Sequence, residues 1–190
     1  MNTPQAWENI RIFGEVSFTH QMLPKPPAAT RIVTGRLDYG IGRVLPGSHT
    51  NRQKQRARRF QSLLLILEAK GQHTPGPARA QLLTYMGSLH ESRIRNRRSD
   101  TSVYGVGSDG FSLEFVKIMP DGGIKFSKRF DTNPAGLQTI LGCLKHVLEV
   151  TAEISPNSSL KLDGDDVDYT DYQISVDHVP SSEDDEDDSV

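Results

Sequence analysis

Hydrophobic and polar residues are arranged along the chain in blocks that predict both strands and helices. The unbroken apolar run from Leu63 to Leu67 predicts a strand that is covered on both faces, at the centre of a sheet. A buried helix is the competing interpretation, but the run is short and Gly71 follows it. We expect further strands at residues 31–38, 101–106, 111–118 and 124–130, with turn sequences between the last three.

Two other segments have apolar residues at helical spacing. The first, at residues 78–92, carries Leu82, Leu83, Met86 and Leu89. The second, at residues 134–154, places six apolar residues on one face: Leu137, Ile140, Leu141, Leu144, Val147 and Leu148. Residues 7–18 fit either a helix or a first strand, and a turn is expected at Gly40 and Gly42.

This order of elements predicts an α/β or α+β domain, built on a central mixed β-sheet that is flanked by helices. We expect the domain to occupy residues 1–154. Residues 155–190 are rich in Ser and Asp and contain six consecutive acids at 183–188, so a disordered acidic tail is predicted.

Charge is divided unevenly between these two parts. Residues 1–154 carry a net +9 and residues 155–190 a net −11, which together give the overall −2. A basic body fits a polyanionic partner, although a merely solvated charged surface is equally open. The tail is either a solubilising appendage or a restraint that folds back on the basic body.

The most basic segment of the chain lies between residues 52 and 59. It could be a solvated loop, a nuclear-import signal or a nucleic-acid contact that binds phosphates without reading sequence. Its cationic residues are Arg52, Lys54, Arg56, Arg58 and Arg59.

Cysteine usage and hydropathy indicate an intracellular protein, in the nucleus or the cytoplasm. Cys143 is the only cysteine, so it has no internal disulfide partner, and no signal-peptide pattern opens the chain. The longest apolar run is far shorter than the roughly 20 residues of a membrane-spanning helix, so no membrane segment is expected. The oligomeric state does not follow from the sequence.

Three charged residues suggest chemistry. Glu68 and Lys70 close the apolar strand and project to the same face, because alternate side chains of a strand share a face. Asp38 ends the preceding strand-like segment, and a neighbouring strand would bring it beside Glu68. Two adjacent carboxylates suit Mg²⁺ or Mn²⁺, and a site of this kind supports phosphodiester hydrolysis, with Lys70 orienting the nucleophile or offsetting transition-state charge.

The arrangement of Asp38, Glu68-x-Lys70 on an apolar strand, and a following helix with Gln81 and Tyr85 resembles the PD-(D/E)XK nuclease superfamily. The stretch from about Gly35 to Glu153 is similar to the nuclease-like domains of uncharacterised fungal proteins. The resemblance implies a restriction-endonuclease-like fold. It also implies metal ligation by Asp38, Glu68 and the Ala69 carbonyl, catalysis by Lys70, support from Gln81 and Tyr85, and a further acid from Glu15 or Glu8.

Leu37 stands where the superfamily's name-giving proline would be. The expected function is a metal-dependent nuclease acting on nucleic acid, with DNA favoured. The alternative is a catalytically inactive nuclease-fold module that binds nucleic acid or a protein partner.

Two other motifs give weaker evidence for a functional site. Residues 105–110 spell G-x-G-x-x-G, but a strand is expected to follow them, so we predict a β-turn and no nucleotide site. Cys143 and His146 are spaced to touch one metal, but no second pair completes a zinc site, and Cys143 fits the core.

Overall fold

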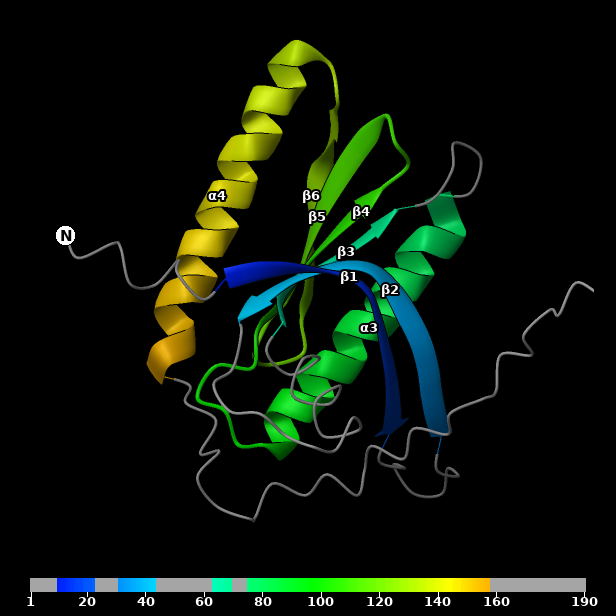
Figure 1. The fold of residues 1–190 in the computed structure, drawn as a ribbon, viewed down its shortest axis with the longest axis vertical. Coiled ribbons are helices and arrows are strands. Elements are labelled where there is room, and N and C mark those ends of the chain that lie inside the picture. The colour runs from blue at the N-terminus through cyan, green and yellow to red at the C-terminus, as the bar shows by residue number, and fades with distance from the viewer. Residues whose placement is uncertain (1–9, 23–30, 44–62, 70–74, 158–190) are drawn as a thin grey trace, which may run out of the picture.

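The computed structural model describes residues 10–22, 31–43, 63–69 and 75–157. These residues form a mixed α+β fold in which two helices pack against a six-stranded sheet (Figure 1). The strands are β1 (Ile10–Met22), β2 (Arg31–Arg43), β3 (Leu63–Ala69), β4 (Val103–Ser108), β5 (Ser112–Ile118) and β6 (Ile124–Asp131). The helices are α3 (Pro75–Arg95) and α4 (Pro134–Asn157).

The strands lie in sequence order across the sheet, and β3 and β4 form the one parallel pair among them. Parallel neighbours need a crossover connection. Here α3 provides it, because it lies between β3 and β4 in the sequence and packs on both strands. The predicted mixed sheet with flanking helices is therefore confirmed at this level.

The first two strands form a long antiparallel ribbon. Residues 7–18, which fitted either helix or strand, contribute to β1 from Ile10 onward. The turn expected at Gly40 and Gly42 is wrong, because β2 continues to Arg43. A Cβ atom on Gly40 would come within 2.5 Å of the Leu63 Cδ2 atom. The glycine is thus explained by close packing of β2 against β3 and not by a change of chain direction.

The apolar segment 63–69 is a strand, as predicted. Strands β2 and β4 flank it, and Leu63, Leu65 and Ile66 are fully buried. A helix in this place could not hydrogen-bond to both neighbouring strands, so the sheet decides between the two interpretations of the run.

One continuous core joins α3 to the sheet. Pro75 and Pro77 are tolerated in the first turn of α3, where backbone N–H groups have no helical acceptor. The helix ends before Arg97, which has a φ of 50°. Its apolar face packs on strands β1 to β5 through Val16, Phe18, Leu37, Leu63, Ile66, Leu82, Tyr85, Met86, Leu89, Val103, Val116 and Ile118.

Residues 105–108 of the G-x-G-x-x-G segment end strand β4, and its last two residues, Asp109 and Gly110, begin the predicted turn to β5. Asp109 closes this turn by accepting hydrogen bonds from the backbone N–H groups of Phe111 and Ser112, at 3.0 and 2.8 Å. Gly110 has a φ of 86°, a conformation that glycine adopts without strain.

Helix α4 packs on β3 and β6, and Figure 1 shows the sheet between it and α3. Asn133 caps its start, because the Asn133 side-chain oxygen accepts the N–H of Gly136 at 2.8 Å. Ile140 is buried, but Leu137 and Leu141 remain 44% and 57% exposed. The sheet therefore covers only part of the predicted apolar face of this helix.

Several predicted features lie outside the described residues. These are the basic segment from Arg52 to Arg59, the acidic tail beyond Asn157, and the catalytic lysine Lys70. Within the described ranges, neither α3 nor α4 combines the length and the apolar character needed to cross a membrane.

Candidate functional site

Asp38 and the Glu68–Ala69 peptide meet at one end of β3. The Asp38 Oδ2 atom accepts a hydrogen bond from the backbone N–H of Ala69 at 2.7 Å. The two residues are 31 positions apart in the sequence, so the antiparallel pairing of β2 with β3 creates this contact. The expected proximity of Asp38 to the Glu-x-Lys segment is present in the structure.

The same β2–β3 register sets the position of Glu68 relative to Asp38. Tyr39 pairs with Leu67, so the next step along both strands brings Asp38 opposite Glu68. Cross-strand neighbours of this kind have adjacent side chains. Glu68 is fully buried, with 0% of its surface exposed. Strand β3 therefore holds a buried carboxylate, Glu68, one residue before the Ala69 N–H that binds the Asp38 carboxylate.

Glu15 is brought near this position by the backbone but turns to another partner. Gly14 pairs with Tyr39 and Val16 with Leu37, so Glu15 lies opposite Asp38 on β1. Its φ of 48° is unusual for a side-chain-bearing residue. Its carboxylate is 72% exposed and pairs with the Arg36 guanidinium at 3.5 Å. In this arrangement Glu15 does not join the buried acid Glu68.

Gln81 and Tyr85 lie one turn apart on α3 and hydrogen-bond to each other. The Tyr85 hydroxyl donates to the Arg36 carbonyl at 3.2 Å. Arg36 is two residues from Asp38 on β2, so the pair links α3 to the strand that carries the acid. Tyr85 is buried and packs edge-on against Phe18, with ring centroids 5.0 Å apart. The contacts made by Gln81 and Tyr85 are those of positioning residues.

The donor set of this site consists of hard oxygen atoms. Asp38 and Glu68 contribute carboxylates, and the Ala69 carbonyl lies at the exposed end of β3. Oxygen ligands of this kind fit Mg²⁺ or Mn²⁺, which keep several water ligands in protein sites. Among the described residues, no group of three or more His, Cys, Asp or Glu side chains is placed to hold a metal ion. A divalent ion here would therefore depend on two carboxylates, a backbone carbonyl and water.

A pocket opens beside this site. It is lined by Arg79, Leu82, Gly107, Ser108, Asp109, Ser112, Glu114 and Arg129. In the parallel β3–β4 pair, Glu68 lies opposite Gly107 and Ala69 opposite Ser108. The pocket therefore begins one strand away from the carboxylates.

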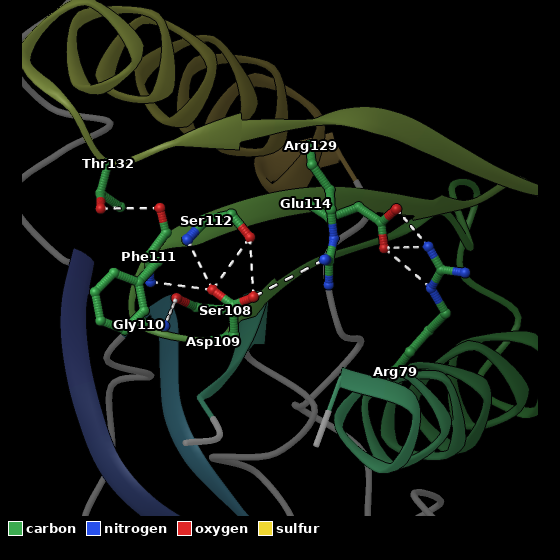
Figure 2. Close-up of polar contacts among 9 residues, drawn as sticks. All are labelled: Arg79, Ser108, Asp109, Gly110, Phe111, Ser112, Glu114, Arg129 and Thr132. Carbon is green, nitrogen blue, oxygen red and sulfur yellow. Dashed lines mark hydrogen bonds and ion pairs between the residues drawn. The ribbon is translucent and has the colours of Figure 1, made fainter. Parts of the chain in front are cut away.

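Figure 2 shows how the charged residues of the pocket are held. The Arg79 guanidinium makes three hydrogen bonds to the Glu114 carboxylate, at 2.5 to 3.0 Å, which tie α3 to β5. These bonds and the Glu114 charge raise the pKa of Arg79. The backbone N–H groups of Ser112 and Phe111 lower the pKa of Asp109. Asp109 thus remains ionised at neutral pH.

Sequence reasoning did not single out the pocket residues. Asp109 was recognised only as part of a turn, and Arg79 lies in the first part of a helix that was chosen for Gln81 and Tyr85. A charged residue at Glu114, inside a strand-like apolar segment, was the available signal. Its partner Arg79 is 35 positions away, so spacing alone could not join them.

Comparison of the chain with protein-family models, with curated proteins and with solved structures found no match.

Proposed function

We propose that this protein is a metal-dependent nuclease of the PD-(D/E)XK type, with a restriction-endonuclease-like fold, acting on DNA. The observation that carries the proposal is the hydrogen bond from the Ala69 N–H to Asp38. It places the upstream acid of the motif at the strand end that bears Glu68. Support also comes from the helix with Gln81 and Tyr85, which directly follows that strand and contacts β2.

Each residue of the site has a distinct role in this proposal. Asp38 and Glu68 hold the divalent ion, and the Ala69 carbonyl adds a ligand. Such an ion, when bound, polarises a phosphoryl oxygen and lowers the pKa of a water. Lys70 orients the attacking water or offsets negative charge in the transition state. Gln81 and Tyr85 fix the strand that carries Asp38, because Tyr85 donates to the Arg36 carbonyl.

A metal titration combined with a cleavage assay tests the proposal. The wild-type chain should bind Mg²⁺ or Mn²⁺ in calorimetry and should cleave a panel of linear, circular and single-stranded DNA. Glu68→Gln should lose both properties while keeping its melting temperature, since the substitution preserves side-chain size. Glu149→Ala is the matched control, because Glu149 is a glutamate on α4 that pairs with Lys145. Metal binding that persists in Glu68→Gln would contradict the proposal.

A second function is favoured by one observation. Glu68 is fully buried and the Asp38 carboxylate already accepts a backbone N–H, so both acids also suit a purely structural role. A catalytically inactive module with this fold would then bind nucleic acid or a protein partner. Binding of the DNA panel without cleavage in Mg²⁺ or Mn²⁺ would favour this module over the enzyme.

A further inference from the structure

One transverse row of residues crosses the sheet from β3 to β6. Glu68 lies opposite Gly107 in the parallel β3–β4 pair, and Gly107 lies opposite Glu114. Glu114 is in turn opposite Arg129 on β6. With about 4.8 Å between neighbouring strands, Arg129 is roughly 14 Å from Glu68 along this row. The pocket and the candidate metal site therefore share one side of the sheet and one level along its strands.

The two arginines of the pocket differ in how firmly they are held. Arg79 is committed to Glu114 by three short hydrogen bonds, and its guanidinium also lies 4.7 Å from the Phe126 ring centre. Glu114 is only 13% exposed, so it needs this partner. Arg79 thus lines the pocket, but Glu114 uses most of its N–H donors, which leaves few for a ligand.

Arg129 has guanidinium N–H donors available for a ligand. Its ion pair with Asp109 has an N–O distance of 3.9 Å, and its side chain is 52% exposed. Asp109 is already satisfied by its own turn, since its Oδ1 atom accepts from two backbone N–H groups and from the Ser112 hydroxyl. Five N–H donors on a guanidinium exceed what one long contact uses. Figure 2 shows this guanidinium between Asp109 and Glu114.

The end of β4 adds little side-chain bulk to the pocket. The Ser108 hydroxyl accepts the N–H of Gly110 at 3.1 Å and so belongs to the turn that follows β4. Gly107, next to it, has no side chain to fill the space above the strand. The Arg129 guanidinium, which lines this pocket, is a suitable donor for a phosphate oxygen.

We propose that this pocket binds a backbone phosphate of a nucleic-acid strand, to one side of the bond that is cut, through Arg129. This proposal rests on the proposed function, because it extends the path of the strand from Glu68 along the row to β6. The phosphate replaces the Asp109 carboxylate as the anion that contacts the Arg129 guanidinium. The Asp109 contact is long, at 3.9 Å, so little is lost when it is replaced. The contact adds affinity and fixes the position of the strand without reading its bases.

The test measures binding separately from cleavage. Fluorescence anisotropy of a labelled 12-nucleotide single-stranded DNA, with Ca²⁺ in place of Mg²⁺, gives the affinity of the full chain at several salt concentrations. We expect Arg129→Gln to weaken binding about fivefold and to lower the slope of log affinity against log salt by about 0.7, the value for one phosphate contact on a single strand.

Lys125→Gln is the matched control. Lys125 lies on the same strand but pairs with Lys117, on the face away from Arg79 and Glu114. It should bind within twofold of the wild type. Equal losses in Arg129→Gln and Lys125→Gln, or no loss in Arg129→Gln, or no binding by the wild type, would overturn the proposal.

The two proposals fail in different ways. If the wild type cleaves DNA but Arg129→Gln binds and positions it normally, the nuclease function stands and the phosphate pocket does not. If Arg129→Gln loses affinity selectively while the wild type shows no cleavage, the pocket stands and catalysis does not. Melting temperatures check that each variant is folded, and Arg129→Gln should melt near the wild type because its ion pair is long and exposed.

Discussion

The Asp38 carboxylate and the Ala69 backbone N–H are joined across β2 and β3 by a hydrogen bond of 2.7 Å. Ala69 is the last residue of β3, so the bond closes the end of the strand that carries Glu68. One side chain thereby has two consequences. It satisfies a backbone donor at a strand end, and it holds a carboxylate beside the residues expected to bind a metal ion.

Two substitutions of Asp38 should separate these consequences. In Asp38→Asn, the amide oxygen can still accept the Ala69 N–H, so the free energy of unfolding in urea should stay close to that of the wild type. Asp38→Ala should lose about 1 kcal/mol, the net value of one hydrogen bond. Both variants should lose divalent-ion binding in calorimetry. Retained cleavage in Asp38→Asn would show that the charge of this residue is not required.

Gly35 is expected to be intolerant of a side chain. A Cβ atom there would lie 2.5 Å from Cε1 of Tyr85. Gly35→Ala should therefore cost about 1 to 3 kcal/mol, as overpacking of a core does. Gly87→Ala on α3 is the control, since nothing lies within 4 Å of its Cβ position, and it should gain about 0.5 to 1 kcal/mol from improved helix formation. Thermal and urea denaturation of the two variants would measure the contrast, and equal stabilities would refute the packing explanation.

The turn at Asp109 should make stability depend on acid. Backbone hydrogen bonds from Ser112 and Phe111 hold the pKa of Asp109 below the ordinary carboxyl value of 3.8. A carboxyl group with a lowered pKa in the folded state stabilises the fold above its unfolded pKa, and this contribution is lost as pH falls through the folded pKa. The stability difference between wild type and Asp109→Ala should thus be largest above about pH 5 and should shrink below about pH 4.

Asp121→Ala provides the comparison for this turn. Asp121 accepts one backbone hydrogen bond, from Gly123 at 2.9 Å, in the turn between β5 and β6. Asp109 accepts two backbone hydrogen bonds and contacts the Ser112 hydroxyl as well. At neutral pH, Asp109→Ala should therefore be the less stable of the two variants in urea denaturation. The reverse order would contradict the assigned role of Asp109.

Arg93 is buried in the part of the fold that the structure describes. Its guanidinium donates to the carbonyls of Ser102 and of Leu63, which connects the end of α3 to the regions where β4 and β3 begin. Burial lowers the pKa of Arg93 to about 9. Arg93→Met should cost about 2 to 4 kcal/mol, because two buried carbonyls lose their donors. Arg97→Met, at an exposed position just past the same helix, should change stability by less than about 0.5 kcal/mol.

The sequence by itself determined the order of the elements. The apolar run at β3, the helical spacing in α3 and α4 and the turn residues around β4 to β6 are local features, so each could be recognised without its neighbours. The motif residues Asp38, Glu68, Gln81 and Tyr85 were identified in the same way. Their roles in catalysis stay predictions, and Lys70 lies outside the described residues.

Tertiary structure decided what sequence spacing could not. The register of β2 against β3 brings Asp38 to Ala69, and the parallel placement of β4 puts Gly107 beside Glu68. The pocket of Arg79, Glu114 and Arg129 forms only where α3, β5 and β6 meet. Gly40 was misread as a turn because close approach of two strands and reversal of the chain both select glycine. The physical reason is the same in each case: contacts between distant segments depend on strand pairing, which local hydrophobic patterns do not specify.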